Sequence, residues 1–572
     1  MTEKLEALKV NVMLLDNCLA HWHAINWQQV NDRISQLRQR IYRASVEGDL
    51  KKVRNLQRLM IRSTANQLWS IRQVTVHNQG RHTPGVDGQL ALTSRERLAL
   101  YKRLKNYTHK DVIPVKRVYI PKAKGQNKYR PLGLPTIVDR CQQTVIKNAL
   151  EPHWEAHFEA TSYGFRPGRS THDAISQVFN VVKGKGTRSW ILDADIEGAF
   201  DHIAHQHIIK SIGNFPGKAW IKSWLKSGIM EQGKYTPTQS GTPQGGVISP
   251  LLLNISLHGL EQQLGINYTK SGNLKQNSPY RLVRYADDFV VMAKNKIACE
   301  HASERITTYL AERGLGLSKE KTQIRHIEEG VDFLGVNIRA RTRKGKKCGK
   351  VILITPSKGA QQQFRDQLRR EWKEVASKPL TWAIVKLNRK VLGWGNYYRH
   401  YVSKRVFSKL DGWMWKRQVR YRYRRHPNKS WKWCYERYWG TIPGRKDKWT
   451  FMNPQTGQYL YKLSWIPIER HRMVQGRHSP DNPHLREYWK KRQEYKKLHG
   501  IEQRNKLWKT QKGVCLICQA GLDNGEELQV HHIKPRKEGG RNTLDNLCIL
   551  HVACHKQIHG RFRKQLKPLR AA

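Results

Sequence analysis

The stretch "LVRYADDFVV", residues 282–291, places two adjacent carboxylates, Asp287 and Asp288, inside a short apolar run. Runs of this length that are rich in Val and aromatic residues are typical of β-strands. Neighbouring strand residues point to opposite faces, so the two carboxylates can share one site only if the chain turns there. Two carboxylates packed together repel each other unless a cation compensates them, which predicts a divalent metal. The alternative is a solvent-exposed hairpin turn, because Asp is common in turns.

The charge of the chain points to a polyanionic partner. Its 572 residues include 104 Lys and Arg against 45 Asp and Glu, giving a net charge of +59 and a pI near 10.2. Such surfaces gain affinity by releasing counterions from phosphates. An anionic membrane surface is the competing interpretation, but no apolar run approaches the roughly 20 residues that a spanning helix needs. The N-terminal segment lacks a signal-peptide pattern, so we expect a cytoplasmic protein.

The nine cysteines are unevenly distributed. Cys18, Cys141, Cys299, Cys348 and Cys434 are scattered singly, whereas Cys515, Cys518, Cys548 and Cys554 crowd into the last part of the chain. This asymmetry predicts a local metal site rather than a disulfide framework.

A third acidic position precedes the pair at 287–288. "SWILDADIEGAFDHI" (189–203) reads as a strand that ends near Asp195 and continues into a turn or helix. An acid at a strand end and a pair at a hairpin turn can meet on one sheet and form the oxygen-rich site that Mg²⁺ prefers. On spacing alone, Asp193 and Asp201 are rival ligands.

Seven short blocks follow one another in order along some 220 residues. They are "YIPKAKGQNKYRPLGLPTIVDR" (119–140), "SYGFRPGRSTHDAI" (162–175), "LDADIEGAFDHI" (192–203), "SGTPQGGVISPLLLNI" (240–255), "RYADDF" (284–289), "GLGLSKEKTQIRHI" (314–327) and "FLGVNI" (333–338). This order resembles that of the reverse transcriptases encoded by group II introns. The resemblance implies a right-hand polymerase in which Asp195, Asp287 and Asp288 hold two Mg²⁺ ions.

The same resemblance implies which residues bind the nucleotide. Lys122 and Arg130 match cations that grip the incoming triphosphate, although both could belong to a solvated basic loop. Phe200 matches the bulky gate that rejects a ribose 2′-hydroxyl, and Gln244 matches a residue that lines the nucleotide pocket. Lys321 is a candidate for contacting phosphate or protonating pyrophosphate, with a solvated lysine as the alternative.

Residues 391–433 combine many cations with stacking-capable rings, which suits structured or single-stranded RNA. A helical bundle with Trp in its core is the alternative. "GWGNYYRH" (393–400) and "RRHPNKS" (424–430) resemble the thumb, or maturase X, domain of the same family. That resemblance implies that the parent intron RNA is a partner.

The tail contains "CLIC" (515–518), "VHHIKPRKEGG" (530–540) and "NTLDNLCILHVACHKQIH" (542–559). Two cysteines separated by two residues, with a second pair of ligands far downstream, predict a structural Zn²⁺ site. A purely structural zinc ribbon is one alternative. The histidines resemble an HNH endonuclease, a ββα-metal fold. The resemblance makes His532 the general base, His531 and His555 the ligands of a catalytic divalent metal, and Asn546 the brace of the loop.

The fourth zinc ligand is open. Cys515, Cys518 and Cys554 are the firm candidates, but the second CxxC expected from the family is replaced by His551-Val-Ala-Cys554. His551 can complete the site, because Cys₃His sites bind zinc. Cys548 is its rival.

Together these observations predict a multidomain protein with α/β and α parts: a right-hand polymerase of fingers and palm, a helical thumb, a DNA-binding segment and a small zinc-containing ββα-metal nuclease domain. The expected boundaries are 1–85 (basic helical extension of the fingers), 86–345 (fingers and palm), 346–440 (thumb and maturase domain), 441–504 (DNA-binding region) and 505–572 (HNH domain). The expected function is RNA-directed DNA polymerase, maturase and second-strand nicking endonuclease in intron mobility. Its partners would be intron RNA, double-stranded target DNA and deoxynucleoside triphosphates. The alternatives are a retron or defence reverse transcriptase and a maturase that only folds RNA.

Overall fold

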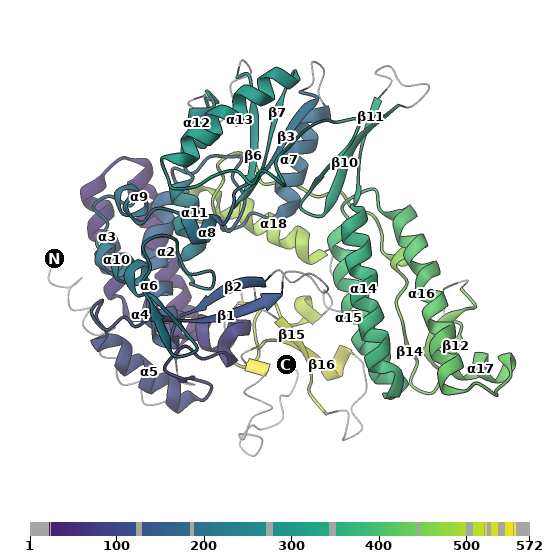
Figure 1. The fold of residues 1–572 in the computed structure, drawn as a ribbon. Helices are drawn as coiled ribbons and strands as arrows, with labels where there is room; N and C mark the ends of the chain where they lie inside the picture. Colours follow the sequence, from purple (N-terminus) through teal and green to yellow (C-terminus); the bar gives the residue numbers. More distant parts are fainter. Residues whose placement is uncertain are drawn as a thin grey trace.

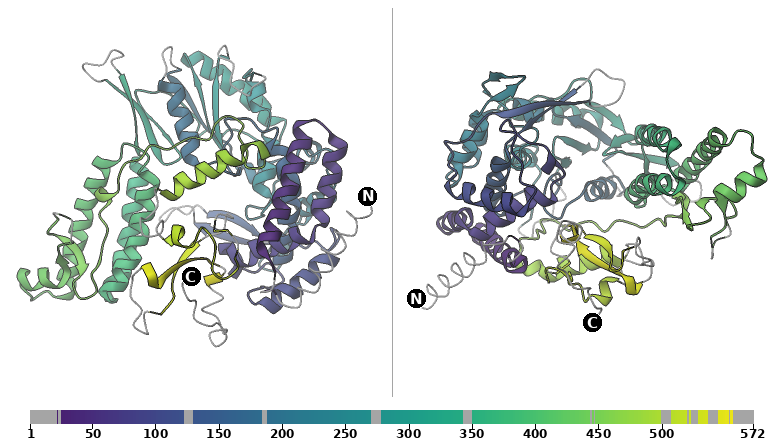
Figure 2. Two further views of the ribbon diagram at one scale, coloured as in Figure 1. Left: turned by 180° about the vertical axis from the view of Figure 1, so that it is seen from behind. Right: turned by 90° about the horizontal axis from the view of Figure 1, so that it is seen from below.

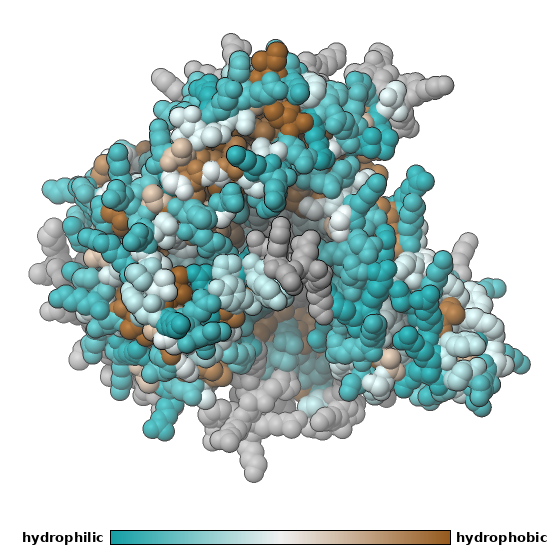
Figure 3. All heavy atoms as spheres, viewed as in Figure 1, coloured by the Kyte–Doolittle hydropathy of each residue, from teal (hydrophilic) through white to brown (hydrophobic). Residues whose placement is uncertain are grey.

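The computed structural model describes residues 22, 25–121, 129–183, 188–269, 278–342, 350–442, 445, 447–498, 507–519, 521–522, 528–535, 544–552 and 554–555. Figure 1 shows N-terminal helices on one side, a sheet above, long helices on the other side and the C-terminal part between and below them. The space-filling view shows a hollow in the middle of this arrangement, bordered mainly by hydrophilic residues (Figure 3). No helix in the described ranges is long and apolar enough to cross a membrane.

The N-terminal part is a layer of helices. It contains α2 (Trp27–Val46), α3 (Leu50–Arg62), α4 (Thr64–Arg72), the π-helix η2 (Gln73–His77), the 3-10 helix η3 (Gln79–His82) and α5 (Ser94–Asn106). Helix α2 begins after Asn26, whose side chain accepts a hydrogen bond from Gln29 N. Its buried residues Val30, Ile34, Leu37 and Ile41 recur every three or four positions, so one face packs inward.

Two sheets and several helices form the next part. The first sheet, in the order β2-β1-β4-β5, contains β1 (Val115–Pro121), β2 (Tyr129–Leu134), β4 (Ile229–Glu231) and β5 (Lys234–Thr236). The second, in the order β6-β7-β3-β8, contains β3 (Trp190–Asp195), β6 (Arg281–Tyr285), β7 (Asp288–Ala293) and β8 (Gln323–His326). The helices are α6 (Ile137–Glu155), α7 (Thr171–Lys183), α8 (Ala199–His202), α9 (His205–Ser211), α10 (Lys218–Lys226), α11 (Ser249–Ser256), α12 (Leu260–Gln263) and α13 (Lys296–Ala311).

The second sheet separates two hydrophobic cores. Leu192 of β3 and Phe289 of β7 face the first core, which also contains the N-terminal helices. Ile191, Val290 and Met292 face the second core, which extends into the C-terminal helices. This alternation is the two-residue period of a strand buried on both faces.

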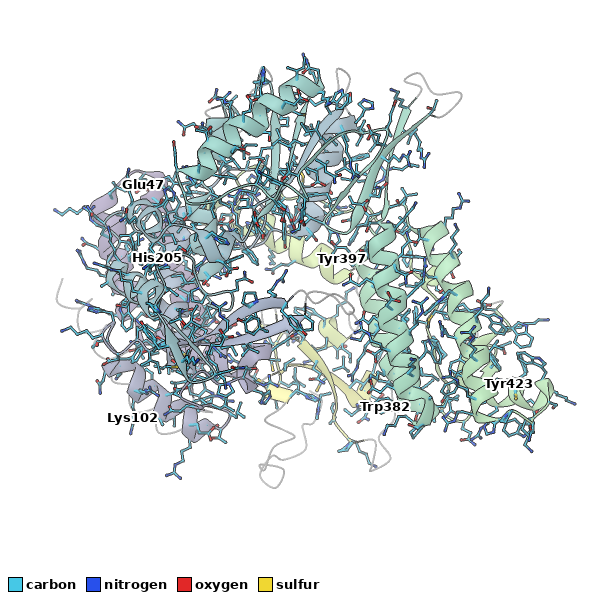
Figure 4. The ribbon with its side chains drawn as sticks, in the orientation of Figure 1. Glu47, Lys102, His205, Trp382, Tyr397 and Tyr423 are labelled. Atoms are coloured by element: carbon cyan, nitrogen blue, oxygen red, sulfur yellow. The ribbon has the colours of Figure 1, made fainter. Side chains whose placement is uncertain are left out.

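The second core continues into a helical bundle. Its elements are β9 (Val331–Phe333), β10 (Val336–Thr342), β11 (Lys350–Pro356), α14 (Lys358–Glu374), the 3-10 helix η4 (Val375–Ser377), α15 (Leu380–Tyr398), α16 (Lys404–Arg425) and α17 (Trp431–Tyr438). Trp394 stacks on Phe364 with ring centroids 4.6 Å apart, so this partly buried tryptophan packs against the core. Figure 4 shows Tyr397 and Trp382 near the two ends of α15. The hydroxyl of Tyr397 donates to the Leu334 carbonyl at 3.0 Å, which ties α15 to the sheet β9–β11.

Residues 439–498, here called the return segment, connect this bundle with the tail and include most of the expected DNA-binding region. It contains β12 (Trp439–Gly440), β13 (Thr450–Asn453), β14 (Gln458–Tyr459), the 3-10 helices η5 (Leu463–Trp465) and η6 (Pro483–Leu485), and α18 (Arg486–Leu498). The view from behind in Figure 2 shows it, in yellow-green, running from the long helices of the bundle across to the N-terminal helices in purple. Asp173 of α7 binds His471 at 2.9 Å and Arg492 at 3.1 Å, so this return segment is anchored to the sheet region.

The tail has a small core of its own. Its antiparallel strands are β15 (Leu528–His532) and β16 (Leu547–His551). The 3-10 helix η8 (Leu544–Asn546) directly precedes β16. Gly521 N donates to the Gln28 side chain of α2 at 3.2 Å, a contact between the tail and the N-terminal helices.

Candidate active sites

The two carboxylates at 287–288 lie where the chain turns, as the sequence requires. Strands β6 and β7 pair with Tyr285 opposite Asp288, so Ala286 and Asp287 form a two-residue turn. On the other side of β7, Asp288 lies directly opposite Asp195 of β3. The structure therefore brings all three predicted acids to one end of the sheet.

The electrostatics of this cluster favour a bound cation. Burial, and then the negative charge of Asp287, raise the pKa of Asp288 to about 7. Burial also raises the pKa of Asp287. The Nζ of Lys321 lies 2.6 Å from Asp195 Oδ2, and this hydrogen bond raises the pKa of Lys321. Carboxylates that resist ionisation because they are buried together are relieved by a divalent ion, which fits the predicted metal.

The two rival acids occupy different positions. Asp193 lies two residues before Asp195 on the same face of β3, opposite Val290 and Gln323, and burial raises its pKa to about 6. Asp201 lies beyond the strand in α8 and accepts a hydrogen bond from Gln244 Nε2 at 2.9 Å. Asp201 therefore orients Gln244.

The loop that carries Gln244 is pressed against the first sheet. A Cβ added to Gly245 would lie 2.3 Å from the carbonyl oxygen of Gly133 on β2, so this approach requires glycine. Phe200, Asp201 and Gln244 line a cavity of about 100 Å³ at this place. A bulky ring and a polar side chain thus face a common small space.

The fingers hairpin is described in part. Arg130 on β2 lies opposite Ile120 on β1, and its positive charge opposes the burial-driven rise in the pKa of Asp287. The guanidinium therefore acts on the acidic cluster. Lys122 lies outside the described residues.

In the tail, four potential metal ligands converge. The ligand atoms of Cys515, Cys518, His551 and Cys554 all lie within 4.8 Å of one another. His551 Nε2 lies 3.2 Å from the Gly521 carbonyl, to which it can donate, which leaves Nδ1 as the acceptor 3.2 Å from Cys518 Sγ. A ligating histidine is normally oriented in this way by its other nitrogen. The set fits Zn²⁺.

Cys548 lies elsewhere. It lies three positions before His551 on β16, and an odd offset along a strand places the two side chains on opposite faces. It packs in the tail core, and burial raises the pKa of its thiol to about 11. The structure groups His551, and not Cys548, with the other three residues.

The remaining tail residues lie around the end of β15. His531 is 5% exposed, and its ring centroid lies 5.2 Å from that of His555. His532 is half-buried at the last position of the strand. Asn546 Oδ1 accepts from Lys534 N at 2.8 Å and its Nδ2 donates to Lys534 O at 3.2 Å, so it fixes the loop after His532.

Comparison with known families gives four matches in chain order. The reverse transcriptase (RNA-dependent DNA polymerase) family matches residues 120–338, and the N-terminal domain of reverse transcriptase matches 22–104. The group II intron maturase-specific domain matches 361–439, and the HNH endonuclease family matches 515–561. Protein YkfC of Escherichia coli K12 is 32% identical over 362 residues, which cover 57% of this chain and 93% of that protein. The chain belongs to the group II intron-encoded reverse transcriptases.

Two further proteins are similar to this chain. The group II intron-encoded protein LtrA of Lactococcus lactis is 33% identical over 336 residues, which span 48% of this chain and about half (55%) of LtrA. Maturase-like protein 1 of Euglena gracilis is 23% identical over 422 residues, or 67% of this chain and 81% of that protein. The predicted fold class, a polymerase hand with a maturase domain and an HNH tail, is confirmed.

Within this intron-encoded protein, sequence reasoning missed Phe165. Its backbone has a positive φ of 58°, rare for a residue with a side chain, and the residue is 50% exposed. The ring centroid lies 6.4 Å from that of Phe200. An exposed aromatic in the block "SYGFRPGRS" was the available signal, but only the fold places it beside Phe200.

Proposed function

We propose that this protein copies intron RNA into DNA at the carboxylates of β3 and the β6–β7 turn. The observation that carries the proposal is the opposition of Asp195 and Asp288 across β3 and β7, with Asp287 in the adjoining turn. Two Mg²⁺ ions would supply charge stabilisation for the attacking 3′-hydroxyl and the departing pyrophosphate. Asp195, Asp287 and Asp288 would hold them, and Lys321 is placed to neutralise charge beside Asp195.

Nucleotide selection is assigned to the space beside this site. Phe200 would exclude the 2′-hydroxyl of a ribonucleotide by its bulk, while Gln244, oriented by Asp201, would contact the nucleotide. Arg130 and Lys122 would bind the triphosphate, a task that suits cations.

Maturase activity is assigned to the thumb, with the parent intron RNA as the partner. Its surface combines rings and guanidinium groups: Trp431 is 47% and Tyr423 60% exposed, and Arg420 and Arg424 of α16 are exposed. Exposed rings can stack on unpaired bases while cations contact phosphates.

The tail would nick the second strand of double-stranded target DNA. His532 would remove a proton from water, His531 and His555 would hold a catalytic divalent metal, and Asn546 would brace the loop. Zn²⁺ at the Cys₃His cluster would hold the domain together. The boundaries 1–85, 86–345, 346–440, 441–504 and 505–572 remain our proposed division of these activities.

The polymerase is tested with Asp287→Ala. This change should abolish primer extension on an RNA template while intron binding and splicing assistance persist, because neither requires polymerisation. Extension at the wild-type rate in Mg²⁺ would refute the assignment. Sequencing of RNA that co-purifies with the protein tests the partner: recovery of one intron supports the proposal, and recovery of a retron-type RNA supports the alternative reverse transcriptase.

The nuclease is tested with His532→Ala. A general base contributes to rate and not to zinc ligation, so second-strand nicking should be lost while zinc content and reverse transcription stay unchanged. Loss of zinc would make His532 a structural ligand. Normal nicking would refute the nuclease role of this residue.

A further inference from the structure

The turn that carries Asp287 has a strained backbone. Ala286, its first residue, has a φ of 59°, in the left-handed region that residues with a Cβ rarely adopt. Such a conformation persists only where the surrounding structure determines it. The contacts of Ala286 therefore show what holds the catalytic turn in place.

One contact comes from Arg284, the last buried residue of β6 before the turn. The residue is 1% exposed, and Nη1 donates to the carbonyl oxygen of Ala286 at 3.4 Å and to Asn254 Oδ1 at 3.0 Å. Nη2 lies 3.8 Å from a carboxylate oxygen of Glu159. One guanidinium thus links the turn to α11 and to the segment after α6.

A second contact comes from Gly164. A Cβ at this position would lie 2.3 Å from Ala286 N and 2.8 Å from the carbonyl carbon of Tyr285. The φ of Gly164 lies outside the left-handed region, so the close approach, and not the backbone conformation, requires glycine. Asn254 Nδ2 donates to the Gly164 carbonyl at 2.8 Å, so Asn254 joins both contacts.

Residues 159–166, which contain Gly164, are themselves held in place by hydrogen bonds. Tyr163 N donates to Arg284 O at 2.9 Å, and Arg284 N donates to Thr161 O at 3.0 Å, which adds residues 161–163 to the edge of β6. Arg166, 5% exposed, donates to the carbonyls of Glu159 and Ser162 at 2.7 and 2.8 Å. The segment that presses against the turn is therefore held by buried hydrogen bonds.

We propose that Gly164, Asn254 and Arg284 form a bracket that fixes Ala286 and thereby sets the separation of the carboxylates of Asp287 and Asp288 from Asp195. They are positioning residues for the polymerase reaction proposed above, on which the inference rests. In the described part of the chain, none of the three lines the cavity that Phe200 and Gln244 share.

The first test is Gly164→Ala, assayed by primer extension and by thermal unfolding. The added methyl group must displace the turn, and a misplacement of about 1 Å costs roughly 100-fold in rate. We expect kcat to fall by about that factor, the KM for deoxynucleotide to stay nearly unchanged and the Mg²⁺ concentration for half-maximal activity to rise. Gly359→Ala is the matched control, because a Cβ there meets nothing within 4 Å.

The second test is rescue. Gly164→Ala with Ala286→Gly removes the 3.0 Å contact with the Ala286 side chain and frees the turn to adjust. The double variant should extend primers faster than Gly164→Ala alone. A double variant that is no faster would contradict the bracket.

Arg284→Lys serves if Gly164→Ala does not fold. Lysine keeps a positive charge beside Glu159 but lacks the planar fork that reaches Asn254 and Ala286 together. kcat should fall while intron RNA binding and the unfolding temperature stay close to those of the wild type. Wild-type extension by this variant, or by a folded Gly164→Ala, overturns the proposal. The polymerase assignment is judged separately, by extension in the wild type and its loss in Asp287→Ala.

Discussion

Arg38 in α2 and Asp481, 443 positions apart in the chain, form two parallel hydrogen bonds, Nε to Oδ1 at 2.8 Å and Nη2 to Oδ2 at 2.7 Å. The same guanidinium lies 2.8 Å from a carboxylate oxygen of Glu151 in α6. All three side chains are largely shielded from water, with 14, 9 and 8% of the arginine, Asp481 and Glu151 side chains exposed. The return segment is therefore fastened to the N-terminal helices at a buried charged cluster.

Arg38→Met should destabilise the protein by about 3–5 kcal/mol, because it leaves the buried carboxylate of Asp481 without its cation. Glu151 would keep only Lys147, whose Nζ lies 3.6 Å away. The measurement is urea unfolding followed by fluorescence. Arg58→Met is the control, since Arg58 is exposed on α3, and its effect should stay within about 0.5 kcal/mol. Equal effects of the two changes would show that the cluster does not fasten the segment.

Phe200→Ala should admit ribonucleotides far better than the wild type, because a gate acts by its bulk, with a smaller loss of deoxynucleotide use. The measurement is single-nucleotide incorporation with each sugar on the same primer and template. The ratio of the two kcat/KM values is the decisive quantity. An unchanged ratio would reduce Phe200 to a packing residue.

Cys515→Ser and Cys548→Ser should differ sharply. The first removes a ligand of the Cys₃His cluster and should release zinc and unfold the tail, because metal binding and folding are one equilibrium in small domains. The second changes a thiol on the opposite face of β16 and should keep one zinc per chain. Metal content and protease resistance of the tail are the measurements. Zinc loss in Cys548→Ser alone would move the fourth ligand from His551 to Cys548.

His153 should make stability depend on pH. It joins α6 to α2, with Nδ1 2.9 Å from Ser45 Oγ, and burial followed by the charge of His157 lowers its pKa to about 4. An unfolded chain binds this proton below about pH 6.5, so stability is lost as pH falls from there toward 4. The slope from one proton is at most about 1.4 kcal/mol per pH unit.

His153→Gln removes this titration and keeps a polar group near Ser45. Its free energy of unfolding should therefore change less between pH 7 and pH 5 than that of the wild type. Chemical unfolding at the two pH values measures the difference. A variant with the wild-type slope would assign the pH dependence to other groups.

The sequence predicted a turn at Asp287 and Asp288, because alternation along a strand would otherwise place the two carboxylates on opposite faces. Spacing left Asp193 and Asp201 as rivals of Asp195, and the family resemblance chose Asp195. Strand β3 ends at Asp195, as its apolar pattern indicated. Spacing in the sequence could not decide whether His551 or Cys548 is the fourth zinc ligand, because both lie close to Cys554 in the chain. It was decided by which face of β16 each side chain occupies.

Other features depend on contacts between distant segments. Residues 439–498 show little periodicity because their position comes from anchors such as Asp173 and Arg38 rather than from a long amphipathic element. Likewise, nothing local in "SYGFRPGRS" shows that Gly164 packs against Ala286. A Cβ added to Gly164 would lie 2.3 Å from Ala286 N, and only the sheet brings the two residues together.

Strands β3 and β7 contribute alternate side chains to the two hydrophobic cores, so we expect the two cores to unfold together. Heat should end copying and RNA handling in a single transition, whereas stripping zinc should silence only the cutting of DNA. A descendant chain that shed the tail would keep a closed hand. One that shed the thumb would uncover part of the second core, to which Phe364, Leu368 and Leu387 of α14 and α15 belong, and would need a new partner to cover it.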